Sequence, residues 1–419
     1  MDDRELVNSI TSNGVKVISE SVPRSKSVAL GFWIDTGSRD ESRMLWGCSH
    51  FLEHLLFKGT EKRDAKEIST SIESRGGYLN AFTDRDMTCY HAKVVERDIE
   101  AAVDVLSDLV QNPLLRRKDI EKELHVVLSE IHSRDDDPQD LIHDLYAVTA
   151  WGDNGAAHPI IGEEATLTEM TSAQISSYYK GAYTPTNLIV TAAGAVDHTK
   201  LMRLVEKYVT FQRETSKQSR ETPIFKPLWS FNERKSSQAQ LAITLEGQPS
   251  ESKGKDALNL INSYLGVGAS SRLFQEVREK QGLVYSIYTS NMSLRDAGLF
   301  NIFAGTLEKN LVKVVETSMR EIDSLHDGSS DFDLPNIKEK TIGFYLLRSE
   351  STDSRMMQLG ASYLRNGRAK SIDEVVDGII AVSESQIQRI TQTFEKNKIA
   401  ITILGASEDT GKKIESILN

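Results

Sequence analysis

Two histidines and a glutamate are the residues of this sequence best placed to do chemistry. His50, Glu53 and His54 occur in the segment Gly47-Cys-Ser-His-Phe-Leu-Glu-His-Leu-Leu-Phe-Lys-Gly. On a helix, positions i, i+3 and i+4 share one face, so both imidazoles could reach one metal ion with Glu53 on the same side. The remaining positions are mostly apolar and predict a buried helix, in which such titratable groups are costly unless paired or metal-bound.

A third ligand would strengthen this metal hypothesis, because a catalytic zinc usually takes three protein ligands and leaves one position for water. The segment 120–132 predicts a helix, and Glu123 and Glu130, seven residues apart, lie on one stripe at the edge of its apolar face. These carboxylates could equally form a solvated rim, and the histidines could simply hydrogen-bond within the core. The residues alone do not choose between Glu123 and Glu130 as the ligand.

Length and composition restrict the class of protein. A chain of 419 residues exceeds one ordinary hydrophobic core, and 39% hydrophobic with 26% charged residues is typical of a soluble globular protein. No apolar run approaches the roughly 20 residues of a membrane span, and the acidic start lacks the features of a secretory signal. The net charge of −11 argues against a nucleic-acid partner. With Cys48 and Cys89 as the only cysteines, we expect a reducing compartment, the bacterial cytoplasm, although a mature organellar protein would look similar.

The two halves of the chain read alike, which predicts a duplicated domain. We expect an N-terminal domain at 1–211, a polar linker with two prolines at 212–228, and a C-terminal domain at 229–419. The matching pairs are Gln174 with Gln386 and Glu96 with Glu308, each 212 residues apart, and Gly194 with Gly405, 211 apart.

Each half predicts an α+β domain in which strands and helices are segregated rather than strictly alternating. Asn13-Gly14 between two strand-like runs predicts a hairpin. The other expected strands are 26–36, 78–83, 87–95, 187–193 and about 397–404, and the expected helices include 44–58, 65–75, a helix from 99 and 117–134.

His50-Phe-Leu-Glu-His54 is the His-x-x-Glu-His motif of the inverzincins. With Gly-Ser-Arg-Asp-Glu before it and Phe-Lys-Gly-Thr after it, the sequence resembles the pitrilysin–insulinase family over nearly its whole length. It is most similar to short two-domain bacterial peptidases related to the catalytic subunit of mitochondrial processing peptidase. The resemblance implies two homologous domains, each a mainly antiparallel sheet packed with helices, that form a half-clamshell.

The resemblance also implies roles for the site residues. The family's third ligand lies 76 residues beyond the second histidine, which here is Glu130, and the family's other acidic residue is matched by Glu123. His50, His54 and Glu130 would hold one Zn²⁺ per chain, and Glu123 would orient a ligand histidine. The ion would lower the pKa of a bound water from about 15.7 toward roughly 7. Glu53 would act as the general base, taking the proton of that water and delivering it to the leaving amine.

The second half lacks the metal ligands, so the resemblance implies that it closes over the substrate rather than cutting it. Arg278 and Tyr285 match residues that grip the substrate carbonyl in relatives, whereas without the family they would read as a surface arginine and a core tyrosine. At an offset of 212, Asn262, Leu265 and Gly266 stand opposite His50, Glu53 and His54, and Ile342 stands opposite Glu130.

Substrate recognition is expected at an edge strand and a glycine-rich loop. Asn80, Ala81 and Phe82 lie in a segment that resembles the family's edge strand, onto which an extended, unfolded peptide adds. Gly266 and Gly268 belong to a stretch that resembles the family's glycine-rich loop. A phosphate-binding loop is the rival interpretation, but no Gly-Lys-Ser/Thr follows.

The sequence therefore predicts a zinc-dependent endopeptidase that cleaves unfolded peptides, pairs as a homodimer, and has neither a nucleic-acid nor a membrane partner. Two other classes compete with this reading. The first is a catalytically inactive or partner-dependent structural subunit of a processing complex, which usually lacks part of the motif that this chain keeps. The second is a nucleotide-binding protein, supported only by the glycine-rich loop.

Overall fold

The structure of the protein, a computed structural model, describes residues 5–212, 219–234 and 236–418. The chain forms two compact units, each built from three segments. Unit 1 comprises Met1–Ile131, Pro159–Arg220 and Leu346–Ile372, and unit 2 comprises His132–His158, Glu221–Tyr345 and Asp373–Asn419. Residues 213–218 of the expected linker lie outside the described residues, and within the rest of the linker Arg220 donates to Asp40 of unit 1 (Nε to Oδ1, 2.7 Å).

Unit 1 contains a six-stranded sheet in the order β1-β2-β6-β3-β5-β4. Its strands are antiparallel except for the parallel pair β2 and β6. The predicted hairpin at Asn13-Gly14 is confirmed, because β1 pairs with β2 and Gly14 takes a φ of +92°. The strands are β1 (Leu6–Ile10), β2 (Lys16–Ser21), β3 (Ser27–Ile34), β4 (Tyr78–Thr83), β5 (Thr88–Val95) and β6 (Leu188–Gly194).

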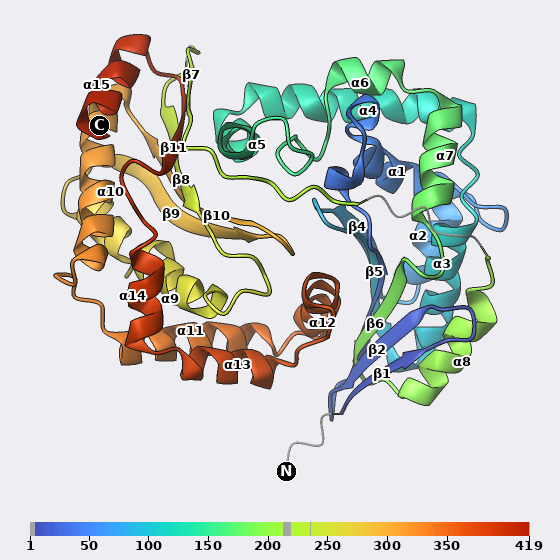
Figure 1. Cartoon of the computed structure of the whole chain (residues 1–419). Coiled ribbons are helices and arrows are strands. Elements are labelled where there is room, and N and C mark those ends of the chain that lie inside the picture. The colour runs from blue at the N-terminus through green and yellow to red at the C-terminus, as the bar shows by residue number, and fades with distance from the viewer. Residues whose placement is uncertain (1–4, 213–218, 235, 419) are drawn as a thin grey trace. The chain divides into compact units, whose positions relative to one another are not determined.

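Most helices of unit 1 cover one face of this sheet (Figure 1). Alternate strand residues such as Val28, Leu30 and Phe32 point into the core beneath them, as the two-residue period of a strand requires. The helices of this layer are α1 (Cys48–Leu56), α2 (Ala65–Glu73), α3 (Ile99–Gln111), α4 (Arg117–Asp136), α6 (Glu164–Glu169), α7 (Ser172–Ala182) and α8 (His198–Tyr208).

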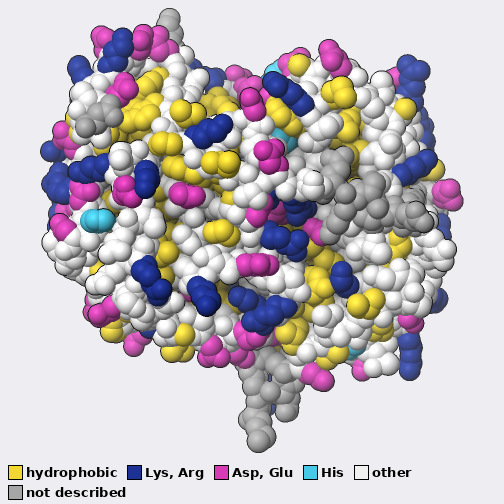
Figure 2. Space-filling view, viewed as in Figure 1, with side chains coloured by type: hydrophobic (Ala, Val, Ile, Leu, Met, Phe, Trp, Pro, Cys, Tyr) yellow, Lys and Arg dark blue, Asp and Glu magenta, His cyan; other side chains and the backbone are white. Residues whose placement is uncertain are grey.

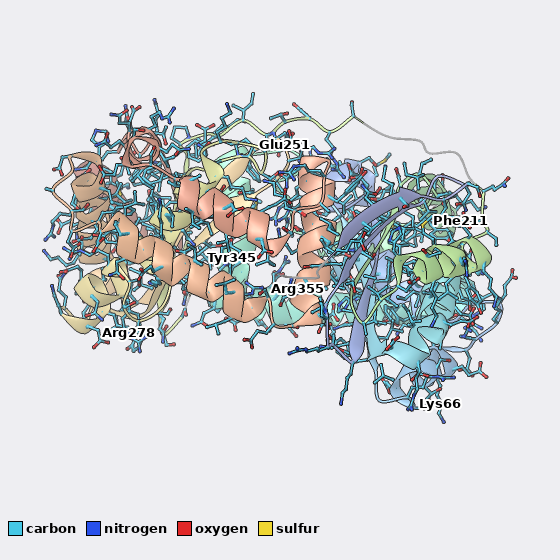
Figure 3. The ribbon with its side chains drawn as sticks, turned by 90° about the horizontal axis from the view of Figure 1, so that it is seen from below. Lys66, Phe211, Glu251, Arg278, Tyr345 and Arg355 are labelled. Atoms are coloured by element: carbon cyan, nitrogen blue, oxygen red, sulfur yellow. The ribbon has the colours of Figure 1, made fainter. Side chains whose placement is uncertain are left out.

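A helix from the second half of the chain, α12 (Thr352–Asn366), covers the opposite face of the first sheet. Met356 and Leu359 of this helix pack against Trp33 of β3. A Cβ atom at Gly360 would lie 2.1 Å from the Trp33 ring, so this glycine lets the helix approach the strand closely. Arg355, labelled in Figure 3, is buried and donates to Glu20 of β2 at 2.6 Å.

Unit 2 repeats this arrangement with a five-stranded sheet in the order β7-β11-β8-β10-β9. One face is covered by helices of the second half, and the other face packs against α5 (Pro138–Trp151), which comes from the first half. The strands are β7 (Trp229–Asn232), β8 (Ala239–Glu246), β9 (Val284–Ser293), β10 (Gly298–Thr306) and β11 (Ile399–Leu404). The helices are α9 (Lys255–Gly266), α10 (Leu311–His326), α11 (Leu334–Arg348), α13 (Ile372–Ala381), α14 (Glu384–Thr391) and α15 (Glu408–Leu418), with a π-helix, η4 (Phe274–Glu279).

The two homologous domains predicted from the sequence are confirmed by the matching strand order. β3 begins at Ser27 and β8 at Ala239, which is the offset of 212 expected from the repeat. Helices α3 and α10 begin at Ile99 and Leu311, again 212 residues apart. The two units do not coincide with the two halves of the chain. Unit 1 includes α12 from the second half, and unit 2 includes α5 from the first half.

One predicted helix begins later than expected. The stretch 44–58 was expected to be helical throughout, but residues 43–45 form a 3₁₀ turn and α1 begins at Cys48. The reason is Gly47, whose φ of +94° is incompatible with a right-handed helix. A Cβ atom there would also lie 2.7 Å from the carbonyl oxygen of Ile161.

The surface carries charges of both signs. On the face shown in Figure 2, acidic and basic side chains are interspersed, which agrees with a sequence of 61 acidic and 50 basic residues. Among the helices of the described residues, none is long and apolar enough to cross a membrane.

Candidate metal centre

Helix α1 is held at its first turn by a buried carboxylate. The backbone N–H groups of Gly47 and Ser49 donate to the two carboxylate oxygens of Glu41, at 2.7 and 2.6 Å. The first N–H groups of a helix have no partner within the helix, and the Glu41 oxygens accept from two of them, although burial raises the pKa of this carboxyl to about 8. Glu41 therefore fixes where the helix begins, and with it the direction in which the side chains of its next turn point.

His50 and His54 of α1 meet Glu130 of α4. Their ligand atoms all lie within 4.8 Å of one another. Glu130 Oε2 lies 3.9 Å from His50 Nε2 and 3.6 Å from His54 Nε2. Two ligands of a tetrahedral zinc, each at about 2.0–2.1 Å from the ion, are separated by roughly 3.3 Å. The cluster therefore fits one zinc ion after small adjustments of the side chains.

The protonation state of the cluster also suits a metal. Burial, together with the smaller effect of the neighbouring His54, lowers the pKa of His50 to about 4. A neutral imidazole is the form that binds a metal ion. Nδ1 of His50 is buried and has no hydrogen-bond partner among the described residues, so the histidine is not explained by a hydrogen bond within the core.

Glu53 is held beside this cluster by the last residue of an edge strand. Thr83 of β4 donates its hydroxyl hydrogen to Glu53 Oε2 at 2.6 Å. Burial raises the pKa of Glu53, and the hydrogen bond from Thr83 and the proximity of His54 oppose that rise. Glu53 is thus a carboxyl with one oxygen occupied by a hydroxyl donor.

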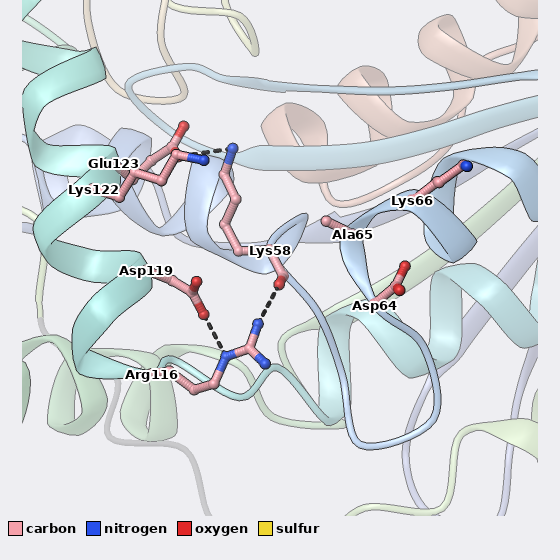
Figure 4. Close-up of a pocket in the computed structure, with 8 residues that line it drawn as sticks. All are labelled: Lys58, Asp64, Ala65, Lys66, Arg116, Asp119, Lys122 and Glu123. Atoms are coloured by element: carbon pink, nitrogen blue, oxygen red, sulfur yellow. Dashed lines mark hydrogen bonds and ion pairs between the residues drawn. The ribbon is translucent and has the colours of Figure 1, made fainter.

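The two glutamates of α4 have different surroundings. Glu130 faces the Nε2 atoms of both histidines, and its side chain is 42% exposed. Glu123 is buried with a side-chain exposure of 3%, and its Oε1 lies 3.2 Å from Nδ1 of His54. Its Oε2 lies 2.7 Å from Nζ of Lys58, an ion pair drawn in Figure 4. The geometry therefore places Glu130 at Nε2 of His54 and Glu123 at Nδ1 of the same ring.

The predicted substrate residues Asn80, Ala81 and Phe82 all lie in β4. This strand is the edge of its sheet, and among the described residues it pairs only with β5. Asn80 is exposed, and its side chain accepts a hydrogen bond from the N–H of Ala81 at 2.9 Å. Phe82 packs edge-on against Trp33, with ring centroids 5.7 Å apart. The strand that ends beside Glu53 is thus free along one edge.

The remaining predicted residues belong to unit 2. Gly266 is the last residue of α9, and a Cβ atom there would lie 2.3 Å from the Thr289 nitrogen of β9, whereas Gly268 has a φ of +81° in the following turn. Arg278 is exposed in the π-helix η4, 4.8 Å above the ring of Phe274. Tyr285 of β9 is 55% exposed, so the alternative of a core tyrosine is wrong.

Three contacting residues were missed by the sequence reasoning: Glu41, Lys58 and Thr83. Lys58 stands four residues after His54, a spacing that could have drawn attention to it, although α1 ends at Leu56. Glu41 and Lys58 lie in the two segments that carry the family resemblance, but those segments do not show what either side chain contacts. The partners of Glu41 and Thr83 depend on where a loop and a strand end come to lie.

Comparison with known proteins identifies the family. The family model described as "Insulinase (Peptidase family M16)" matches residues 16–164, and the one described as "Peptidase M16 inactive domain" matches residues 169–341. An uncharacterized zinc protease of Streptomyces coelicolor is 34% identical over 406 residues, covering 94% of this chain and 88% of the relative. The chain belongs to peptidase family M16, the insulinase family. The resemblance inferred from the His-x-x-Glu-His motif is thereby confirmed.

Other similar proteins support the same family assignment. The uncharacterized zinc protease YmxG of Bacillus subtilis is 33% identical over 396 residues, covering 94% of this chain and 97% of the relative. A probable mitochondrial-processing peptidase subunit beta of Arabidopsis thaliana is 29% identical over 413 residues, covering 95% and 78%. The crystal structure of a protease from Helicobacter pylori matches with a TM-score of 0.88 over 96% of this chain and 99% of that chain. At 22% identity it supports the fold alone.

Proposed function

We propose that this M16 protein is a zinc-dependent endopeptidase that hydrolyses extended, unfolded peptides. The observation that carries the proposal is the convergence of His50, His54 and Glu130, with Glu53 of the same helix beside them. The names of its relatives, zinc proteases in two bacteria, support the metal but leave the substrate open.

His50, His54 and Glu130 would hold one zinc ion per chain, while Glu123 keeps the His54 ring in place from its other nitrogen. When bound, the ion supplies Lewis-acid polarisation and makes a water molecule more acidic. The low pKa of His50, about 4, keeps this ligand neutral at physiological pH without help from the metal.

Glu53 would be the general base. Because Thr83 occupies Oε2, the other carboxylate oxygen is left to accept a proton from the attacking water. The raised pKa of this buried carboxyl makes it a better proton acceptor than an exposed glutamate, and it can return the proton to the leaving amine.

Substrate would bind by strand addition to the free edge of β4. An extended peptide can pair with the backbone of Asn80, Ala81 and Phe82, and strand addition reads backbone conformation more than side chains. Folded proteins present few free strands and should be poor substrates. Stabilisation of the reacting carbonyl by Arg278 and Tyr285, contacts from Gly266 and Gly268, and pairing as a homodimer are further predictions of this proposal.

Zinc content and cleavage of an internally quenched basic peptide, measured together, test the proposal. Wild type should hold about one zinc and cut the peptide, and Glu53→Gln should keep the zinc but lose about 10²–10⁴-fold in rate. The control is Glu121→Gln, an exposed glutamate of α4 that pairs with Arg117. A wild type that binds no zinc and cuts nothing would contradict the proposal and favour a non-enzymatic or partner-dependent subunit.

A further inference from the structure

We infer that Lys58 is a positioning residue of the metal centre, which acts by holding Glu123 against His54. The inference rests on the proposed function, because it assigns to Lys58 a role in zinc binding. Lys58 lies in the Phe-Lys-Gly-Thr segment that resembles the family, but it stands outside the His-x-x-Glu-His motif and cannot itself be a metal ligand while protonated.

Glu123 is a buried carboxylate with two partners. One oxygen is 3.2 Å from His54 Nδ1 and the other is 2.7 Å from Lys58 Nζ. A carboxylate with only 3% of its side chain exposed is costly to bury unless both its charge and its lone pairs are satisfied. The ammonium group of Lys58 contacts the second oxygen and supplies a positive charge next to this carboxylate.

Lys58 is itself fixed by the start of α4. Arg116 donates to the backbone carbonyl oxygen of Lys58 at 2.8 Å and to Asp119 at 2.5 Å. Figure 4 shows this chain of contacts along a cavity of about 330 Å³, with Lys58 between Arg116 and Glu123. The segment just after α1 is therefore tied to α4 at two points, through its backbone and through its ammonium group.

The consequence for His54 is geometric. With Glu123 as the acceptor at Nδ1, the ring carries its hydrogen there, and Nε2 keeps its lone pair toward Glu130. If Glu123 lost its contact with Lys58, its carboxylate could rotate toward water in the adjacent cavity and the ring would lose its orientation. Lys58 thus acts on the ligand through Glu123 and not by touching the metal.

Lys66 lines the same cavity and provides a matched control. It lies on the first turn of α2, is exposed, and points away from Glu123 in Figure 4. If nearby positive charge alone supported zinc binding, removing Lys66 should matter about as much as removing Lys58. If contact with Glu123 is what matters, only Lys58 should matter.

The experiment measures zinc affinity of the folded metal-free protein by competition with a chromophoric chelator. The variants are Lys58→Met, Lys58→Arg, Glu123→Gln, the double variant Lys58→Met with Glu123→Gln, and Lys66→Met. Loss of a residue behind a metal ligand typically weakens affinity by about 10–100-fold. We expect roughly tenfold weakening for Lys58→Met, near wild-type affinity for Lys58→Arg, and a change of less than about twofold for Lys66→Met.

The double variant decides whether Lys58 acts through Glu123. Affinity within about twofold of Glu123→Gln alone supports the inference, because coupled residues are not additive. Additive losses, or a Lys58→Met affinity within about twofold of wild type, would overturn it. Should Lys58→Met fail to give a cooperative thermal transition, Lys58→Gln replaces it under the same criteria. A wild type that binds no zinc overturns the proposed function instead, so the two failures are distinguishable.

Discussion

Helices α1 and α4 of unit 1 and helices α9 and α11 of unit 2 are equivalent in the repeat but are joined by different chemistry. Across the first pair, His50 and His54 face Glu130. Across the second pair, Lys340 of α11 donates to the backbone carbonyls of Ser263 and Val267 near the end of α9, at 3.0 and 2.8 Å. Because its ammonium group is partly buried, the pKa of Lys340 is lowered.

The comparison teaches that the same pair of helices can be joined either through a cluster of potential metal ligands or through hydrogen bonds from a lysine. At the positions equivalent to the ligands, unit 2 has Asn262, Gly266 and Ile342, of which only the asparagine offers a polar side chain. Gly266 lies so close to β9 that no imidazole could replace it without moving the strand. In unit 2, a glycine at the position of the second histidine allows α9 to pack closely against β9. Helices α9 and α11 are joined by Lys340 and not by metal-ligating side chains.

The largest effect should come from giving unit 1 the residue of unit 2. His50→Asn removes an imidazole ligand, and we expect zinc affinity to fall on the order of 10³-fold or more, with loss of peptide cleavage. Chelator competition and a cleavage assay measure both. The reciprocal change, Asn262→His, should bring no second zinc, because the equivalents of the other ligands are Gly266 and Ile342. A second zinc in that variant would refute the comparison.

Removing the metal should affect the two helix pairs differently. Zinc at about 100 times its dissociation constant would add about 2.7 kcal/mol to the stability of the state that binds it. After chelation, we expect amide hydrogen exchange in α1 and α4 to accelerate by up to about 100-fold. Exchange in α9 and α11 should change little, since Lys340 joins them. Equal acceleration in both pairs would mean that the metal stabilises the whole chain and not its own helix pair.

The hydrogen bonds from Lys340 should contribute to the stability of the protein and not to its zinc affinity. Lys340→Met leaves two carbonyl oxygens without their donor, and we expect the free energy of unfolding to fall by about 2 kcal/mol. Urea unfolding measures this change, and zinc affinity should be unaltered. The control is Lys412→Met, whose fully exposed pair with Glu408 should contribute nothing measurable to stability. A Lys340→Met protein as stable as the Lys412→Met control would show that the Lys340 hydrogen bonds contribute nothing to the free energy of unfolding.

The smallest effect concerns Glu53, the proposed general base, and the hydroxyl that holds it. Thr83→Val keeps the shape of the side chain but removes the hydroxyl that holds Glu53, and we expect kcat to fall about tenfold, equivalent to about 1.4 kcal/mol. Zinc content should not change, and Thr83→Ser should restore most of the rate. An unchanged kcat, or a loss that Thr83→Ser does not repair, would argue against an orienting role for this hydroxyl.

Local signals predicted the elements well. The strand at 78–83 is found as β4, the helix expected from 99 begins at Ile99, and the helix expected at 117 begins at Arg117. Periodic apolar positions and turn residues act over a few neighbours, so the sequence carries them directly. The start of α1 was missed because the left-handed Gly47 interrupts a run that reads as helical.

The sequence by itself determined the repeat, the secondary structure and the face shared by His50, Glu53 and His54, because each depends on spacing along the chain. Only the tertiary structure decided which α4 glutamate lies beside His50 and Nε2 of His54, since Glu123 and Glu130 lie on one stripe of the same helix. It also decided the contacts of Lys58 and Thr83 and the exchange of α5 and α12 between the units. These features depend on contacts between segments far apart in the chain, which no local pattern encodes.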